Sequence, residues 1–120
     1  MIIADDMAAH EPADTIVELR TTFSRRELAA ACGSRLVSGR LAACVQIDGP
    51  ITSVYRWEGR VEMAEEFSCT AKTSRDRAEA CAAAILEGHE YRTPQLVVSL
   101  VSASASYAAW VAESVAASRT

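Results

Sequence analysis

Histidine, cysteine and carboxylate side chains are the groups in this sequence that could bind a metal ion or act as a nucleophile. Soft and borderline metal ions need several thiolate, imidazole or carboxylate groups that converge on one point. The chain has two histidines and four cysteines. His10 falls in a predicted terminal tail, which leaves His89 as the imidazole candidate. A cysteine–histidine nucleophile would need Cys44 or Cys69 beside His89, and the sequence does not fix that distance.

The cysteines are widely spaced and form no CxxC pair. Their even number allows two disulfides, a pattern typical of short secreted chains. Each cysteine also lies in an apolar, periodic stretch, where a free cysteine behaves as a small buried hydrophobe. We therefore expect buried thiols at Cys32, Cys44, Cys69 and Cys81. Cys44 is interpreted as a core thiol on a buried strand, with a metal or redox role as the alternative.

The segment around His89 combines several polar side chains in a predicted loop. Glu90, Tyr91 and Arg92 follow His89 directly. Binding residues gather on loops that a rigid scaffold positions. We therefore predict a ligand site in this loop, with His89 and Tyr91 among its binding residues.

Three further candidates lie on predicted strands. Tyr55 and Trp57 recur at strand spacing, which favours a packing role, while a ligand cleft at a subunit boundary is the alternative. Lys72 is the only lysine of the chain and falls on the predicted solvent face of its strand. A solvated charge and a contact with an anion both remain open for Lys72.

Length and composition indicate one domain. The chain has 120 residues, of which 50% are hydrophobic and 23% charged, with a formal net charge of -4, which is an ordinary globular balance. The negative charge argues against a nucleic-acid partner, and no stretch approaches the length of a membrane span. Residues 1–13 do not read as a secretory signal. We expect a flexible tail over residues 1–13, a domain over residues 14–120 and a cytoplasmic location.

The elements that must position these side chains follow from periodicity. Alternation predicts a strand over residues 14–23, and a capping box from Ser24 to Glu27 predicts a helix over residues 24–39. A strand over residues 42–47 is expected to end in a turn at residues 48–50, before a hairpin over residues 51–73 centred on Glu58 and Gly59. A helix over residues 73–88, a strand over residues 95–101 and a last helix from Ser104 or Ser106 complete the chain. The expected fold is α+β, a ferredoxin-like βαββαβ antiparallel sheet with an extended hairpin and an extra C-terminal helix.

Two features of this predicted sheet concern its contacts with water and with other chains. The glutamates Glu62, Glu65 and Glu66 are expected to make an acidic hairpin tip that projects into solvent. The strand over residues 95–101 lies at the sheet edge, is almost wholly apolar and carries no charge. Edge strands are normally short, charged or bulged, because an exposed edge recruits other chains. We expect another copy of the chain to cover it in a closed ring. The alternative is that the terminal helix covers this edge within one chain.

The stretch over residues 40–77, RLAACVQIDGPITSVYRWEGRVEMAEEFSCTAKTSRDR, resembles the CutA (divalent-cation tolerance) family. The resemblance rests on the LAAC strand at residues 41–44, the S-V-Y-R-W-E-G hairpin at residues 53–59 and the K-T pair at residues 72–73. HEYRTPQLVVSLV at residues 89–101 and the terminal helix with Tyr107 and Trp110 resemble later family segments. The resemblance implies a homotrimer of ferredoxin-like subunits and a link to tolerance of copper and other divalent cations.

The same resemblance implies where a copper ion would bind. Some family members form a copper site from a cysteine on the first strand, a histidine at the end of the second helix and a glutamate after the loop proline. In this chain those positions correspond to Arg20, His89 and Gln95. Only His89 retains a metal-binding side chain, so the chain departs from the pattern and an inherited copper site is not expected.

The function that the resemblance implies is a trimeric binding or regulatory module in divalent cation (copper) tolerance and metal-ion homeostasis. The alternative is a PII-like sensor that binds a small anionic metabolite at clefts between subunits. An enzyme is not expected, because acylphosphatase-type chemistry on this fold needs an asparagine and the chain contains none. A divalent cation such as copper is the one cofactor candidate, and the candidate ligand-binding residues are Cys44, Trp57, Lys72, His89 and Tyr91.

Overall fold

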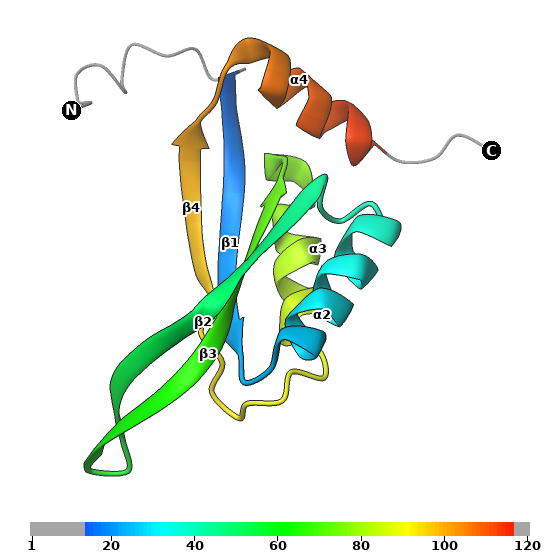
Figure 1. Ribbon diagram of the computed structural model, residues 1–120. Helices are drawn as coiled ribbons and strands as arrows, with labels where there is room; N and C mark the ends of the chain where they lie inside the picture. Colours follow the sequence, from blue (N-terminus) through cyan, green and yellow to red (C-terminus); the bar gives the residue numbers. More distant parts are fainter. Residues whose placement is uncertain (1–13, 117–120) are drawn as a thin grey trace.

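The computed structural model describes residues 14–116. The predicted tail, residues 1–13, lies outside the described residues. The elements in chain order are β1 (Thr15–Phe23), α2 (Arg26–Ser38), β2 (Cys44–Trp57), β3 (Arg60–Thr73), α3 (Arg75–Leu86), β4 (Val97–Ser102) and α4 (Ala105–Ser114). This order confirms the predicted βαββαβ pattern with an added C-terminal helix (Figure 1).

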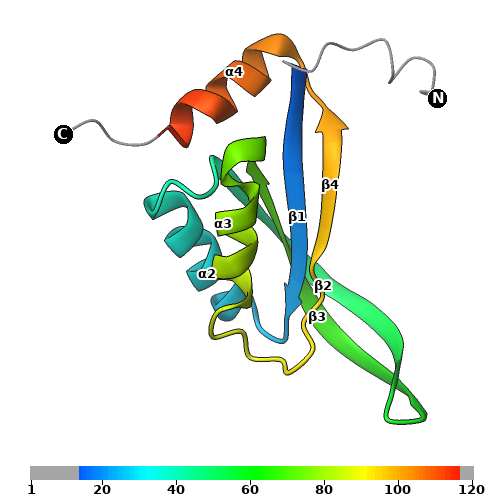
Figure 2. The same ribbon diagram turned by 180° about the vertical axis from the view of Figure 1, so that it is seen from behind.

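The four strands form one antiparallel sheet in the order β2-β3-β1-β4. Helices α2 and α3 lie side by side on one face of this sheet (Figures 1 and 2). The helix α4 crosses the end of the sheet where β1 begins and β4 ends. No helix among the described residues is long and apolar enough to cross a membrane.

The main core lies between the sheet and the helices α2 and α3. Alternate residues of β1 point into it, and Leu19 is fully buried there. Leu36 of α2, Ala71 of β3 and Ile85 of α3 are also 0–1% exposed. Burial of apolar side chains from all three layers stabilises the arrangement, at about 1.5–3 kcal/mol for each large side chain.

The predicted turn at residues 48–50 is wrong, because β2 continues through this segment. The pairing of β2 with β3 shifts register between Asp48 and Ile51, as at a β-bulge. Gly49 takes a φ of 147° there, which L side chains rarely adopt. A Cβ at Gly49 would lie 2.7 Å from Phe67 Cδ2. The bulge therefore bends one long strand instead of ending it.

The hairpin turn at Glu58 and Gly59 is confirmed. Both residues have positive φ, 49° and 79°, which matches the right-handed twist of the flanking strands. Trp57 and Arg60 form the last pair before the turn. Beyond the body of the sheet, β2 and β3 continue as a two-stranded arm (Figure 1). This arm is the extended hairpin that the sequence predicts.

The capping box predicted from Ser24 is also wrong. Helix α2 begins at Arg26, and its N-cap residue Arg25 makes no side-chain cap hydrogen bond. Ser24 binds the distant Glu90 instead, through its amide at 2.7 Å and its hydroxyl at 2.6 Å. A tertiary contact has therefore replaced the local cap. At α4 the predicted start is confirmed, because the Ser104 hydroxyl accepts a hydrogen bond from the Tyr107 amide.

The outer edge of β4 is open in the described chain. Strand β4 pairs with β1 on one side only, and Val97, Val98 and Leu100 are 53%, 53% and 52% exposed. Helix α4 packs instead against a small cluster that contains Ile16 and Val101. The terminal helix therefore does not cover this edge.

Candidate functional site

A cleft of about 900 Å³ lies between the hairpin arm and the loop that joins α3 to β4. Strand β2 contributes Tyr55 and Trp57 to its wall, and β3 contributes Glu66. The loop contributes residues 90–95. Two of the predicted ligand-binding residues, Trp57 and Tyr91, therefore line one cavity.

The His89 ring anchors the start of this loop to β1. The ring stacks on Phe23, with centroids 4.4 Å apart and planes 11° apart. Its Nδ1 accepts a hydrogen bond from the Tyr91 amide at 3.1 Å, so the ring proton lies on Nε2. Nε2 then donates to Thr21 Oγ1 at 3.1 Å. Burial lowers the pKa of His89, which keeps the imidazole neutral at pH 7.

The two carboxylates that line the cleft are both engaged by neutral donors. Glu66 Oε2 accepts a hydrogen bond from the Tyr91 hydroxyl at 2.7 Å, and Glu90 accepts the two hydrogen bonds from Ser24. Burial, followed by the hydrogen bond to Glu66, raises the pKa of Tyr91. Glu66 was expected on a solvent-exposed acidic tip, so that expectation is wrong for Glu66. It is half-buried because it faces the loop.

Arg92 is the loop cation at this cleft. Its guanidinium carbon lies 5.6 Å from the centre of the Trp57 ring, within range of a cation–π contact. It also approaches Glu58 Oε2 at 4.0 Å, between side chains that are 79% and 72% exposed. An ion pair this exposed contributes little. The contact with Trp57 places the positive charge at the cleft.

The residues present do not fit the copper site that the resemblance implies. Both ring nitrogens of His89 are engaged, by Tyr91 and Thr21. Arg20 is a cation and Gln95 a neutral amide where the pattern has a thiolate and a carboxylate. In residues 14–116, no group of three or more histidine, cysteine or acidic side chains is placed to hold a metal ion. His89 positions the loop in this structure.

The cysteines are free, and three of them are core residues. Cys32, Cys69 and Cys81 are 0–1% exposed, which confirms the prediction of buried thiols for these three. A hydrogen bond with Cys32, together with burial, raises the pKa of Cys69, and burial raises the pKa of Cys81 to about 11. Cys69 and Cys81 therefore remain protonated at neutral pH and are poor metal ligands and nucleophiles.

Cys44 and Lys72 lie at the other end of the sheet from this cleft. They pair across β2 and β3, and Lys72 pairs in turn with Glu18 of β1. Glu18 and Phe23, on which His89 stacks, are about 17 Å apart along an extended strand. Cys44 is half-buried instead of fully buried. The predicted set of ligand-binding residues therefore divides between two places.

Lys72 is neither a simple solvated charge nor an open anion site. Its Nζ forms an ion pair with Glu18 Oε2 at 2.7 Å, and the two side chains are 19% and 30% exposed. The hydrogen bond from Lys72 to Glu18 raises the pKa of the Lys72 ammonium. Glu18 therefore already compensates its positive charge.

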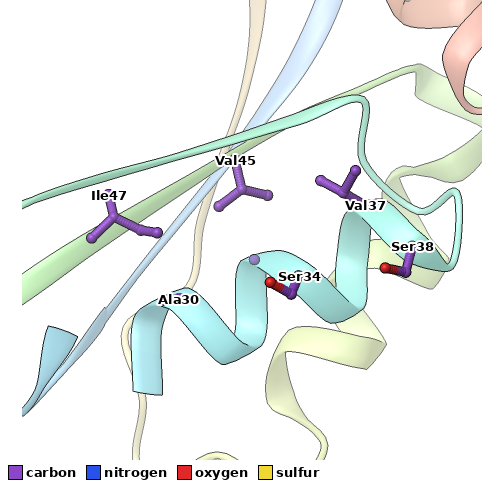
Figure 3. A pocket seen from close by; sticks show the side chains of 7 residues that line it. Ala30, Ser34, Val37, Ser38, Val45 and Ile47 are labelled. Carbon is purple, nitrogen blue, oxygen red and sulfur yellow. The ribbon is translucent and has the colours of Figure 1, made fainter. Parts of the chain in front are cut away.

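A second, smaller hollow of about 380 Å³ lies between α2 and β2. Figure 3 shows Val45 and Ile47 over the helix, with the hydroxyls of Ser34 and Ser38 as the polar groups. Gly33 lets the helix approach the strand, since a Cβ there would lie 3.0 Å from Val45 Cγ1. None of the described residues that line it is charged. The hollow offers packing surface and little chemistry.

Sequence reasoning missed the residues that hold the loop in place. The sequence pattern predicts only a strand for Thr21 and Phe23, and only a helix cap for Ser24. Their partners are more than sixty positions away in the chain. The alternation of β1 does carry one usable signal, because Thr21 is a polar residue on its buried face.

Comparison with known proteins agrees with this architecture. The family model described as "CutA1 divalent ion tolerance protein" matches residues 16–114. The chain is similar to Protein CutA, chloroplastic, of Arabidopsis thaliana, with 32% identity over 94 residues, which are 78% of this chain and 52% of the relative. It is also similar to the divalent-cation tolerance protein CutA of Yersinia pestis, with 35% identity over 65 residues, 54% of this chain and 55% of the relative. The matches thus span about half the length of these curated relatives.

Solved structures show the same fold. The divalent ion tolerance protein CutA1 from Ehrlichia chaffeensis superposes with a TM-score of 0.81 at 30% identity, covering 85% of this chain and 96% of that one. CutA from Synechococcus elongatus superposes with a TM-score of 0.80 at 30% identity, covering 86% and 92%. The family match covers the sheet and all three helices. The chain therefore belongs to the CutA1 divalent ion tolerance protein family.

Proposed function

We propose that this protein is a homotrimeric binding or regulatory module, not an enzyme, that contributes to tolerance of divalent cations, copper among them. Family membership supports the link to cations, because the Yersinia pestis relative is named a divalent-cation tolerance protein. The observation that carries the assembly is the open, apolar edge of β4. Such an edge recruits another chain unless something covers it.

The hairpin arm supplies a matching edge. Strand β1 pairs with β3 only from Phe67 to Thr73, so residues 60–66 of β3 have no paired strand on that side within the described chain. Strand β4 has 6 residues, a length that this segment can pair with. Val54, Val61 and Met63 on the arm are 61%, 66% and 71% exposed. Pairing of one arm with the β4 edge of the next copy would cover both surfaces.

An arm-to-edge contact is heterologous, since each copy offers two different surfaces. A contact of this kind either closes into a ring or continues as a filament. The family resemblance favours a ring of three. The open edges therefore support the contact between copies, and the family resemblance supports the number of three.

The proposed role in cation tolerance does not depend on copper bound at His89. The donor set around His89 does not suit copper, as described above. We therefore assign the role to the assembled protein and not to a copper site at His89. The PII-like alternative receives no support from the comparisons, and the cytoplasmic location remains a prediction.

A growth assay tests the proposed function. A strain that lacks the gene is complemented with the wild type, with Leu100→Lys on the β4 edge, or with Leu86→Lys as the matched control. Leu86 is 46% exposed at the end of α3, away from both edges. Loss of the gene should lower the copper concentration that stops growth, and the wild type and Leu86→Lys should restore it. Leu100→Lys, whose dissociation is checked by sedimentation, should not.

Two results would contradict the proposal. Equal copper, zinc and cobalt tolerance with and without the gene would remove the function. Full restoration by a Leu100→Lys protein that sediments as a monomer would separate the function from the trimer.

A further inference from the structure

Three buried thiols share the main core, each contributed by a different element. Cys32 lies on α2, Cys69 on β3 and Cys81 on α3, and all three are 0–1% exposed members of one hydrophobic cluster. The proposed function makes no use of them. We propose that Cys32 and Cys69 are a redox pair that hydrogen peroxide converts to a disulfide, which locks α2 onto β3. This role goes beyond the proposed cation tolerance and does not depend on it.

The packing of α2 on β3 brings these two thiols together. Cys69 Sγ lies 3.9 Å from the carbonyl oxygen of Ala29 on α2. Cys32 is one turn further along α2 and, like Ala29, faces the core. Helical side chains tilt towards the preceding turn, which directs Cys32 towards the place where Cys69 meets the helix. The two thiols are hydrogen-bonded to each other, so the pair is already assembled in the reduced protein.

The surroundings make the two sulfur atoms chemically unequal. A hydrogen bond from the Cys69 thiol lowers the pKa of Cys32 to about 7, with burial opposing the change and the Arg35 guanidinium supporting it. The same hydrogen bond, together with burial and the neighbouring Cys81, raises the pKa of Cys69. The thiolate is the nucleophilic form of cysteine. Cys32 is therefore the member of the pair that reacts with peroxide, and Cys69 is the member that resolves the product.

The reaction takes two balanced steps. The Cys32 thiolate attacks one peroxide oxygen and the O–O bond breaks, which leaves a sulfenic acid on Cys32 and a hydroxide that is protonated to water. The Cys69 sulfur then attacks the Cys32 sulfur and the S–O bond breaks, so that hydroxide leaves with the Cys69 proton as a second water. The two thiols lose two electrons and the peroxide gains them. A dithiol reductant reverses the change.

Access limits the rate of this reaction. Neither sulfur atom is exposed, so peroxide, a molecule close in size to water, reaches them when α2 opens locally. The start of α2 favours such opening, because Arg25 supplies no side-chain cap and the Ser24 hydroxyl is bound to Glu90. We therefore expect slow oxidation at millimolar peroxide, and not the rapid reaction of an exposed thiolate.

Mass spectrometry of the full chain identifies the bond. A Cys44→Ala background removes the half-buried thiol that would react first. After treatment with hydrogen peroxide, alkylation and digestion, the peptides that contain Cys32 and Cys69 should be joined, and dithiothreitol should separate them. Cys32→Ala should abolish the link. Cys81→Ala is the matched control, because it removes another buried core thiol and leaves the pair intact.

Thermal unfolding tests whether the bond locks the fold. The disulfide closes a loop of about 40 residues, which should raise the melting temperature by about 10 °C. The increase should disappear after dithiothreitol. The same peroxide treatment should leave the melting temperature of Cys32→Ala unchanged, with all samples at one protein concentration.

Three results would overturn the proposal. A link that forms only in urea would show that the folded core excludes peroxide. Links from Cys81 to either partner, in equal yield, would show random pairing among buried thiols. An oxidised protein that melts at a lower temperature than the reduced one would show a strained cross-link and not a lock.

Discussion

Two buried threonines on neighbouring strands allow a direct test of how the loop is held. Thr21 and Thr73 are both 0% exposed. Thr21 Oγ1 accepts the hydrogen bond from His89 Nε2 at 3.1 Å, whereas Thr73 Oγ1 has no hydrogen-bond partner among the described residues. Valine keeps the β-branched shape of threonine and removes only the hydroxyl oxygen. The same substitution should therefore have opposite effects at the two positions.

The expected magnitudes follow from the two environments. Thr21→Val removes one acceptor of the half-buried His89 imidazole, which should reduce the free energy of unfolding by about 0.5–1.5 kcal/mol. Thr73→Val removes a hydroxyl that is buried without a partner, which should raise the free energy of unfolding by about 1 kcal/mol. In a chain of 120 residues, each kcal/mol moves the melting temperature by about 4 °C.

The assay is urea unfolding at pH 8, where His89 is neutral, with every variant at the same protein concentration because assembly contributes to stability. His89→Phe supplies a second background for the comparison, since phenylalanine can keep the stack on Phe23 but has no N–H group. In that background Thr21→Val should no longer be destabilising. Equal destabilisation by Thr21→Val and Thr73→Val would refute the reasoning, because the cost would then not come from the bond to His89.

Three further predictions concern other contacts. Burial lowers the folded-state pKa of His89 from 6.5, so the unfolded chain binds more protons and stability should fall as the pH decreases through 6.5. The drop in the urea unfolding midpoint from pH 8 to pH 5.5 should be smaller in His89→Phe than in the wild type, and an equal drop would contradict this. Gly49→Ala should cost about 1–3 kcal/mol in thermal unfolding, because φ is positive and Phe67 blocks the Cβ; an unchanged melting temperature would be inconsistent with the bulge. Lys72→Met should cost about 1 kcal/mol by leaving Glu18 unpaired, and no loss would show that solvent already screens the pair.

Local pattern was sufficient for the elements that a period defines. Strand β1 alternates along most of its length, and the stripe through Cys81 and Ile85 predicted α3 because both residues face the core. The 58–59 turn was recognisable because Gly59 tolerates positive φ. In these segments, local preference and tertiary packing favour the same structure.

Local pattern failed where a distant residue decided the outcome. Ser24 has the spacing of a helix cap, yet Glu90 competes for its hydroxyl and amide. The 48–50 segment has turn chemistry, yet continued pairing with β3 makes it a bulge. The engaged nitrogens of His89 could not be inferred either, since Thr21 belongs to another element. The sequence therefore identified the loop as a candidate site but not the contacts that shape it.

The claim on which the account depends is that the apolar outer edge of β4 is covered by another copy of the chain. Light scattering of the purified protein over a hundredfold range of concentration tests it directly. The account predicts a mass near three times 12.9 kDa for the wild type, and a smaller mass for Leu100→Lys. A wild-type mass that stays at 12.9 kDa throughout would contradict it.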